Sequence, residues 1–199
     1  MTRSPRSPRS PRSPRPPRRL VGIVGAPGVG KSTLAAKLAA SAPDGTAAVL
    51  PMDGFHLPPA RLVELGRRDR MGAPDTFDVD GFVAVLRALR SDDADVSAPA
   101  FDRATEEPVP GAIVIGRDIR TVYVEGNYLL LWPEVPPLLD ETHYLRLDET
   151  VRRARLVARH ILSGKSPDAA AAWVRDVDEP NARSIAASAE RATRTLSVD

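Results

Sequence analysis

The sequence predicts an α/β fold, a doubly wound parallel sheet with helices on both faces, on three observations. Short apolar runs alternate with helical segments over residues 20–199. The first run, 20–24, reads LVGIV, which is typical of a parallel strand buried on both faces. Turn-forming residues such as Pro43-Asp44-Gly45 separate the successive elements. Strands that alternate with helices in this way favour a parallel sheet.

The first half of the chain supplies the opening strands and helices of this sheet. In order, the predicted elements are strand 20–24, helix Lys31–Ser41, strand 46–52, helix 61–66 and helix 81–90. The helix 81–90 is amphipathic, and its inward face is expected to carry Phe82, Val85, Leu86 and Leu89. Asp80 directly precedes this helix and is expected to cap it.

The second half continues the alternation. Its predicted elements are strand 96–101, a hairpin or loop at 106–118, strands 121–125 and 142–147, helix Glu149–Leu162, a helix from 166 past 173, and strand 194–198. Prolines and glycines interrupt the segment 106–118, whereas Pro167 stands where proline favours the start of a helix. Trp132 and Trp173 are expected to pack in the core or between helices.

The composition is that of one globular domain. A chain of 199 residues with 42% hydrophobic content can bury one core but is too short for two ordinary domains. Cysteine is absent from the sequence, which excludes disulfides and cysteine-based metal sites and fits a reducing compartment. We therefore expect a cytoplasmic location.

Residues 1–19 form a cationic arm that precedes the predicted domain, 20–199. Arg-Ser-Pro repeats from Arg3 to Pro14, and the arm holds seven arginines and no acidic residue. Proline at every third position excludes helix and sheet, so we expect a disordered arm. The arm either binds an anionic surface or is a dispensable extension, such as a start codon assigned too early. Without it, 21 basic residues stand against 26 acidic ones, which argues against a nucleic-acid-binding domain.

One segment imitates an export signal. Arg18-Arg19 precede the apolar run 20–26, and Ala40-Ser41-Ala42 resembles a cleavage site. The apolar run is short and leads directly into a glycine-rich loop, so we do not expect export. The sequence holds no stretch near the roughly 18 apolar residues of a membrane span, and none is expected.

The glycine-rich loop follows the first predicted strand. Its sequence, Gly25-Ala26-Pro27-Gly28-Val29-Gly30-Lys31-Ser32, matches the phosphate-binding pattern G-x-x-x-x-G-K-[ST], and Thr33 completes the expected nucleotide-binding set. Glycines let backbone N–H groups face phosphate oxygens, and the following helix directs its positive end at the same anion. Lys31 is expected to bridge the β- and γ-phosphates, and the Ser32 hydroxyl to ligate Mg²⁺. The alternative is an ordinary glycine turn between a strand and a helix.

Two carboxylates follow predicted strands whose carboxyl ends would lie beside this loop. Glu125 ends strand 121–125 and is expected to hold Mg²⁺ directly or through water; the alternative is a surface glutamate at a strand end. Asp53 follows strand 46–52, at the edge where open α/β sheets bind ligands, and could accept the proton of an attacking hydroxyl. An Asp-Gly pair such as Asp53-Gly54 is also common in plain turns.

Three further segments carry a family resemblance. They are Met52-Asp53-Gly54-Phe55-His56-Leu57, Gly72-Ala73-Pro74-Asp75-Thr76-Phe77-Asp78 and Val124-Glu125-Gly126-Asn127-Tyr128-Leu129-Leu130. In this order they resemble the nucleoside/nucleotide kinase family, which is related to bacterial pantothenate kinase, uridine kinase and phosphoribulokinase. The resemblance covers nearly all of residues 20–199 and points to the fructose-transport-system or uridine-kinase-like branch. It implies a fold of the P-loop NTP hydrolase type with a helical lid, and ATP and Mg²⁺ as cofactors.

The resemblance also implies roles for particular residues. Asp53 would be the catalytic base, and Glu125 would accompany Mg²⁺. The remaining implied residues are the lid arginines Arg155 and Arg159, Asn181 near the nucleotide base, and Phe101 and Arg103 in the acceptor pocket. Beside them, His56 either orients the acceptor or is simply a packed side chain.

One position departs from the family pattern. Relatives usually carry lysine where this chain has Met71. If that lysine contacts an anionic acceptor in relatives, this chain would prefer a neutral acceptor, unless Arg67, Arg68 or Arg70 takes over the role.

These observations predict an ATP-dependent kinase that phosphorylates a hydroxyl group of a small metabolite. The acceptor stays open among sugars, nucleosides, pantothenate-like alcohols and polyols, and ATP is assumed over GTP only by default. The alternatives are a transport ATPase subunit and a GTPase-like or regulatory nucleotide-binding protein without kinase activity. The guanine motif Asn-Lys-x-Asp does not begin at Asn127 or Asn181, and 162–165 matches the ATPase signature poorly. Family members are often dimers, so a homodimer is left open, while no specific nucleic-acid partner is expected.

Overall fold

The computed structural model describes residues 17–91 and 94–198. Most of the predicted arm therefore lies outside the described residues. Strand β1 already begins at Arg19, one residue before the predicted domain boundary. Arg18 is buried, and its guanidinium donates to the backbone carbonyls of Ala94, Gly116 and Ile119. The fold thus includes the last two arginines of the predicted arm, because carbonyls far along the chain accept hydrogen bonds from Arg18.

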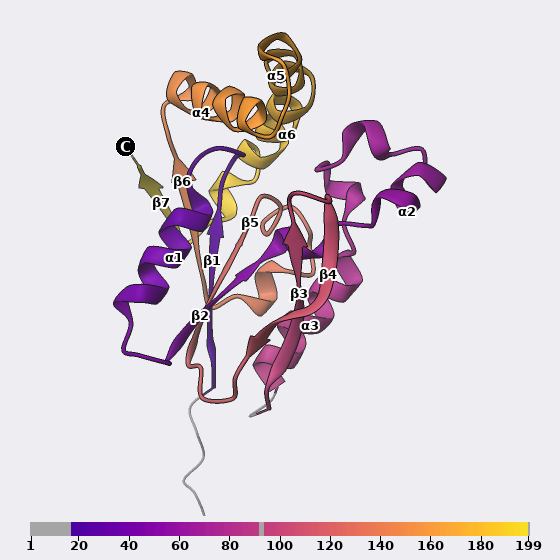
Figure 1. Ribbon diagram of the computed structural model, residues 1–199. Helices are drawn as coiled ribbons and strands as arrows, with labels where there is room; N and C mark the ends of the chain where they lie inside the picture. The colour runs from indigo at the N-terminus through magenta and orange to yellow at the C-terminus, as the bar shows by residue number, and fades with distance from the viewer. Residues whose placement is uncertain (1–16, 92–93, 199) are drawn as a thin grey trace, which may run out of the picture.

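Five parallel strands form the central sheet of the described residues, in the spatial order β2-β5-β1-β6-β7. They are β1 (Arg19–Val24), β2 (Ala47–Pro51), β5 (Thr121–Gly126), β6 (Glu141–Arg146) and β7 (Arg194–Ser197). Each neighbouring pair is parallel, so all carboxyl ends lie at one edge, the upper edge in Figure 1. Strands β5 and β2 lie on one side of β1, and β6 and β7 lie on the other. The carboxyl end of β1 is therefore the switch point of the sheet.

Helices cover both faces of this sheet. Helix α1 (Lys31–Ser41) packs against the side chains of Val21 and Ile23 on one face. Helices α3 (Val79–Ser91) and α6 (Glu179–Ala186) pack on the other face, against Leu20 and Val24. Successive residues of a strand point to opposite faces, so the side chains of β1 contribute to the core on both sides of the sheet. The predicted doubly wound sheet is confirmed.

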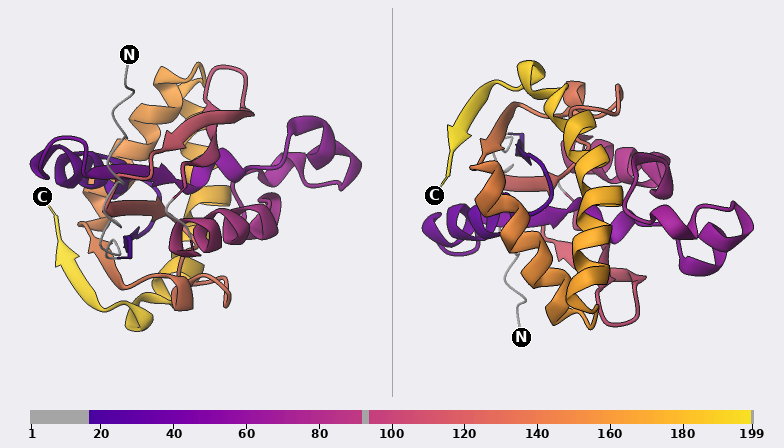
Figure 2. Two further views of the ribbon diagram at one scale, coloured as in Figure 1. Left: turned by 90° about the horizontal axis from the view of Figure 1, so that it is seen from below. Right: turned by 90° about the horizontal axis from the view of Figure 1, so that it is seen from above.

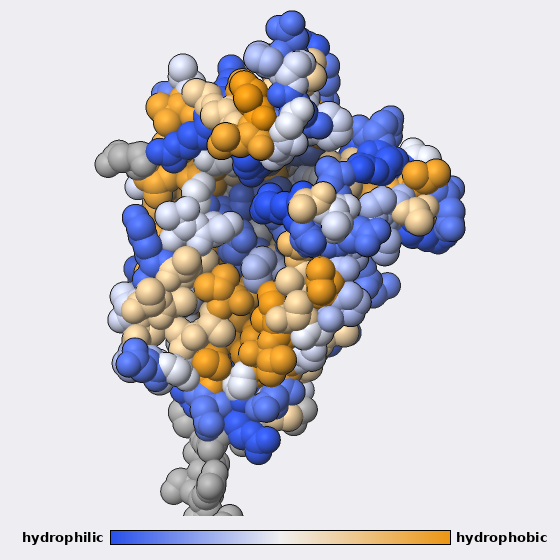
Figure 3. Space-filling view, in the orientation of Figure 1, coloured by the Kyte–Doolittle hydropathy of each residue, from blue (hydrophilic) through white to orange (hydrophobic). Residues whose placement is uncertain are grey.

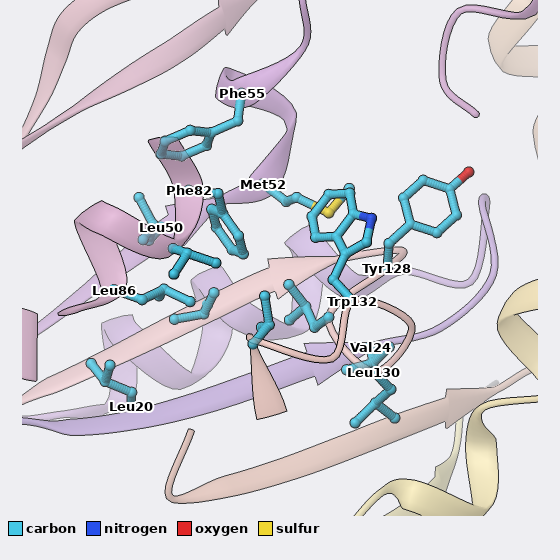
Figure 4. Packing of buried hydrophobic residues seen from close by; sticks show 14 of the residues in the cluster. Leu20, Val24, Leu50, Met52, Phe55, Phe82, Leu86, Tyr128, Leu130 and Trp132 are labelled. Carbon is cyan, nitrogen blue, oxygen red and sulfur yellow. The ribbon is translucent and has the colours of Figure 1, made fainter. Parts of the chain in front are cut away.

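The larger core cluster lies beneath α3. Phe82 of α3 and Trp132 are almost fully buried, and their rings pack edge-on with centroids 6.0 Å apart. Figure 4 shows these two side chains beside Met52 and Tyr128, close to the carboxyl edge of the sheet. Trp132 is therefore a core residue, as predicted, and the core extends to the segments that carry the candidate site.

The capping residue of α3 differs from the prediction. Helix α3 begins at Val79, so Asp80 already lies inside its first turn. The backbone N–H of Gly81 donates to Asp78 Oδ1 at 2.9 Å, which makes Asp78 the cap. The predicted cap was wrong because the helix starts two residues earlier than the apolar pattern indicates.

A separate β-hairpin lies beside the sheet. Strands β3 (Val96–Asp102) and β4 (Glu107–Ile115) pair antiparallel, so the segment 106–118 supplies one continuous strand of a hairpin with 96–102 and does not form a hairpin or loop by itself. The 3₁₀ turn η1 (Met52–Phe55), which follows β2, packs directly on β3. A Cβ at Gly54 would lie 2.1 Å from the carbonyl oxygen of Pro99, so only glycine fits this contact. Gly54 therefore allows η1 to pack closely against β3.

The C-terminal helices stand above the carboxyl edge of the sheet. Helix α4 (Glu149–Leu162) has its predicted bounds, and α5 (Pro167–Trp173) continues through a π-helical turn (Val174–Asp178) into α6. Pro180 has no N–H group and cannot donate a helical hydrogen bond. The N–H of the preceding Glu179 donates to the carbonyl oxygen of Val174, five residues back, as in a π-helix. Seen from above in Figure 2, α4 and α6 lie side by side over the strands, as a lid would, while the short helix α2 (Pro59–Glu64) projects away from the body.

Among the helices of residues 17–91 and 94–198, none combines the length and the apolar character required to cross a membrane.

Candidate active site

The phosphate loop occupies the switch point between β1 and α1. Gly28 and Gly30 have φ angles of 82° and 99°, a left-handed conformation that glycine adopts without strain. A Cβ at Gly28 would lie 2.8 Å from Leu156 Cγ of α4, whereas at Gly30 no atom lies within 4 Å. Gly28 is thus required by packing as well as by backbone angle. The loop ends at the start of α1, where the first backbone N–H groups have no acceptor within the helix.

Lys31 is a buried cation held against the loop. Its ammonium donates to the carbonyl oxygens of Gly25 at 2.9 Å and Ala26 at 3.1 Å, and the residue is 8% exposed. Burial lowers the pKa of Lys31 to about 8, although the negative charges of Glu125 and Asp53 oppose the shift. A polyphosphate bound beside this ammonium would add negative charge, which favours the protonated form that burial disfavours.

The lowered pKa of Lys31 predicts a specific dependence of stability on pH. The pKa returns to 10.5 in the unfolded chain, so between about pH 8 and pH 10.5 unfolding takes up a proton at this residue. Its contribution to the free energy of unfolding therefore rises with pH in this window. Relative to a Lys31→Met variant, the wild-type chain should gain about 2 kcal/mol between about pH 7.5 and pH 9.5, measured by urea unfolding. A constant difference between the two proteins would contradict a lowered pKa.

Ser32 and Glu125 lie side by side at the mouth of the loop. The Ser32 hydroxyl donates to Glu125 Oε1 at 2.9 Å, and Glu125 stands opposite Ile23 in the sheet register. Glu125 is buried, and burial raises its pKa while the nearby Lys31 lowers it. A hydroxyl and a carboxylate are the oxygen donors that Mg²⁺ prefers, so the pair fits the predicted ion. Within residues 17–91 and 94–198, no cluster of three or more His, Asp or Glu side chains could hold a metal ion.

Asp53 lies on η1 across from the loop. Its Oδ2 accepts a hydrogen bond from Arg103 at 2.8 Å, so the predicted base and a predicted acceptor-site residue are in contact. The Asp53 side chain is 30% exposed and can be reached by a ligand. Its negative charge also acts on Lys31, which places both groups in one electrostatic environment.

His56 is packed between two aromatic rings. The ring centroids of Phe77 and Phe101 lie 4.0 Å and 4.6 Å from that of His56. His56 Nδ1 lies 2.7 Å from the carbonyl oxygen of Asp53, which can only accept, so Nδ1 carries the proton. Burial lowers the pKa of His56 and favours the neutral ring. The imidazole thus fixes the backbone of Asp53 and lies beside Phe101, another predicted acceptor-site residue.

The arginines near Met71 already have carboxylate partners. Arg67 and Arg70 both pair with Asp75, at 3.3 Å and 2.7 Å, and Arg68 pairs with Glu106 at the tip of the hairpin. If one of these arginines takes the role of the family lysine, an anionic acceptor has to compete with the carboxylate of Asp75 or Glu106 for that arginine.

The predicted lid residues lie on α4 and α6. Arg159 is exposed, yet its charge lowers the pKa of Lys31, and its own pKa is lowered by desolvation while Asp178 and Asp53 raise it. The charge of Arg159 therefore acts on the group that is predicted to bind phosphate. Arg155 is exposed on α4 and Asn181 is half-buried on α6. The contacts of all three with a nucleotide stay predictions.

One contact of the phosphate loop was not predicted from the sequence. Arg152 of α4 is 1% exposed and donates to the carbonyl oxygen of Pro27 at 3.3 Å. Arg152 lies three residues after Glu149, a spacing that indicates an ion pair within one helix. In the structure, Arg152 Nη2 lies 2.6 Å from Glu149 Oε2. The contact with Pro27 joins residues 125 positions apart, and no local pattern encodes it.

The surface is hollowed between the α4–α5 helices and the tip of the β3–β4 hairpin (Figure 3). A mostly apolar cavity of about 300 Å³ lies nearby, lined by His56, Pro58, Pro99 and Pro108 among others. Lys31, Asp53 and Glu125 do not line that cavity. The charged groups at the carboxyl edge, and not this cavity, mark the candidate active site.

A phosphate loop at the switch point of a parallel sheet, facing a partly exposed carboxylate, defines the class of P-loop phosphotransferases. The chain is 41% identical to a "putative fructose transport system kinase" from Silicibacter sp. TM1040, whose crystal structure matches with a TM-score of 0.84 over 92% of this chain and 91% of that one. It is 40% identical over 133 residues to the ATP-dependent kinase-like protein notR′ of Aspergillus versicolor, which spans 61% of this chain and 77% of the relative. A "Putative uridine kinase" of Schizosaccharomyces pombe is 39% identical over 161 residues, 73% of this chain and 67% of that protein.

No protein-family model matches the chain. The relatives nevertheless settle its membership: the chain belongs to the nucleoside/nucleotide kinase family of P-loop proteins, as its motifs predicted.

Proposed function

We propose that the chain transfers the γ-phosphate of MgATP to a hydroxyl group of a small metabolite, such as a sugar, a nucleoside or a pantothenate-like alcohol. The observation that carries this proposal is the shared environment of Lys31 and Asp53. Burial lowers the pKa of the Lys31 ammonium, and the negative charge of Asp53 acts on the same group and partly opposes that shift. A candidate phosphate-binding cation at the start of α1 and a candidate base on η1 therefore share one electrostatic environment, after the ends of β1 and β2.

The loop would bind the donor. Its backbone N–H groups and the Lys31 ammonium would hold the β- and γ-phosphates, in exchange for the carbonyls of Gly25 and Ala26 that Lys31 now contacts. Ser32 and Glu125 would hold magnesium, which neutralises negative charge on the phosphates. Arg155 and Arg159 would approach the phosphates from α4, and Asn181 the nucleotide base from α6.

The acceptor would bind at Asp53. This carboxylate can take the proton of the attacking hydroxyl, provided that the hydroxyl replaces the Arg103 guanidinium or shares the carboxylate with it. His56 holds the backbone carbonyl of Asp53 through Nδ1, next to the residue that would act as base. Phe101 and Arg103 would line the acceptor side. Two relatives, the "putative fructose transport system kinase" and the "Putative uridine kinase", have names that fit a hydroxyl acceptor.

The test combines calorimetry with a screen for acceptors. Purified chain is titrated with MgATP, and ADP formation is then measured against sugars, nucleosides, pantothenate-like alcohols and polyols. We expect MgATP binding and ADP release that depends on one class of acceptor, with the phosphorylated product identified by mass spectrometry. Comparison with GTP determines the preferred donor. A folded chain that takes up no magnesium nucleotide would refute the proposal.

A further inference from the structure

Arg152 is a charged side chain in an almost fully buried position. It is 1% exposed, and a buried guanidinium is tolerated only with partners for its charge and N–H groups. Its Nη2 donates to Glu149 of the same helix at 2.6 Å and to Glu179, the first residue of α6. Arg152 thus joins the beginnings of two helices of the lid.

The same guanidinium reaches the phosphate loop. Nη1 donates to the carbonyl oxygen of Pro27 at 3.3 Å. The backbone of this part of α4 also lies against the loop, because a Cβ at Gly28 would stand 3.1 Å from the carbonyl oxygen of Arg152. Helix α4 therefore contacts the loop both through its backbone and through one side chain.

The direction of the Pro27 carbonyl has a consequence for phosphate binding. In a trans peptide, the C=O of one residue and the N–H of the next point in opposite directions. Described residues contain no cis peptide, so a Pro27 carbonyl turned toward α4 directs the Gly28 N–H away from α4. A phosphate loop depends on N–H groups that converge on the anion.

We infer that Arg152 is a positioning residue, which orients the Pro27–Gly28 peptide for nucleotide phosphates and couples the loop to α6 through Glu179. The inference rests on the proposed function, since it concerns the same donor site. None of the hydrogen bonds that Arg152 makes to described residues reaches Asp53 or a predicted acceptor-site residue, so we expect its effect at the donor site. The Arg152 Nε is buried without a hydrogen-bond partner among the described residues, which leaves Pro27, Glu149 and Glu179 as the contacts that hold the group.

The neighbouring Arg153 provides a matched control. It also donates to Glu179, at 2.8 Å, but its side chain is 55% exposed and pairs with the same carboxylates from the surface. Arg153→Met removes one arginine from Glu179 while the bond between Arg152 and Pro27 stays. A general loss of positive charge would affect both variants alike, whereas positioning of the loop depends on Arg152 alone.

The experiment compares Arg152→Met, Arg152→Lys and Arg153→Met with the wild-type chain by MgATP calorimetry and steady-state kinetics. Arg152→Met is expected to weaken MgATP binding and to raise KM for ATP by about tenfold or more, with KM for the acceptor unchanged. Arg152→Lys keeps one donor and should recover part of the loss, and Arg153→Met should stay within about twofold of wild type.

Urea unfolding checks that each variant is folded. If Arg152→Met does not fold, Arg152→Lys and Glu179→Gln carry the test, and each should weaken MgATP binding more than Arg153→Met does. Wild-type affinity in folded Arg152 variants, or equal losses in the Arg152 and Arg153 variants, would overturn the inference alone. A wild-type chain that binds no MgATP would overturn the proposed function as well, so the two failures are distinguishable.

Discussion

Replacement of Lys31 by methionine is expected to lower kcat/KM for ATP by at least about a thousandfold. Methionine preserves the length and most of the volume of the side chain but removes the only charge that the phosphate loop itself supplies. In phosphoryl transfer, negative charge spreads over the γ-phosphate oxygens, and a positioned cation stabilises it. The measurement is the rate of ADP formation at saturating acceptor, with wild-type and variant chains compared at equal concentration.

The stability of the variant separates this effect from unfolding. At neutral pH the folded wild-type chain buries a protonated amine whose pKa is lowered by burial, and this costs free energy. Lys31→Met removes that cost, so the ligand-free variant should unfold at an equal or higher urea concentration than wild type. Lys37→Met is the matched control, because Lys37 is exposed on the same helix and should leave turnover unchanged. If Lys31→Met retained more than about a tenth of wild-type turnover, the loop would not serve the donor phosphate.

The parts of the site that could be predicted are those encoded locally. The loop from Gly25 to Ser32 is contiguous, and each residue type has a chemical reason that holds wherever the strand and helix lie. Glu125 and Asp53 were predicted from one topological rule, that parallel strands end at the same edge. The contact between Ser32 and Glu125 follows that rule, because β5 is the neighbour of β1.

The parts that could not be predicted depend on how separate elements meet. Arg152 could be interpreted as half of an ion pair within α4, but its contact with Pro27 needs the packing of α4 on the loop. The pairing of His56 with Phe101 needs the hairpin to fold against η1. In each case the sequence identifies the chemical group and the tertiary structure supplies its partner.

The strand and helix boundaries show the same division. Helix α4 begins at its predicted residue because Asp148 caps it, accepting from the N–H groups of Thr150 and Val151, and that signal is local. The cap of α3 was misassigned because two aspartates, Asp78 and Asp80, stand near the start of the helix. In the structure, the bridge between His56 and Phe77 immediately precedes Asp78, and Asp78 accepts the hydrogen bond from the Gly81 N–H.

Replacement of Asp53 by asparagine is expected to lower kcat by at least about a hundredfold while MgATP binding is retained. The amide has nearly the same shape but cannot take the proton of the acceptor hydroxyl. The negative charge of Asp53 opposes the lowering of the Lys31 pKa by burial, so Asp53 acts on the phosphate site. Its replacement takes negative charge away from that site, and MgATP affinity should be equal or higher. Calorimetry measures the affinity, and acceptor-dependent ADP formation measures kcat. Asp44→Asn, at an exposed turn between α1 and β2, is the matched control with wild-type rates expected.

The pair between Asp53 and Arg103 must be separated from the role of Asp53 as base. Arg103→Met breaks the same ion pair and leaves the carboxylate in place, so it should lower kcat by less than about tenfold, with any larger effect confined to KM for the acceptor. If Arg103→Met reproduced the full loss of Asp53→Asn in kcat, the carboxylate would act only by holding Arg103. A loss specific to Asp53→Asn, with Arg103→Met close to wild type in kcat, assigns proton transfer to the carboxylate itself.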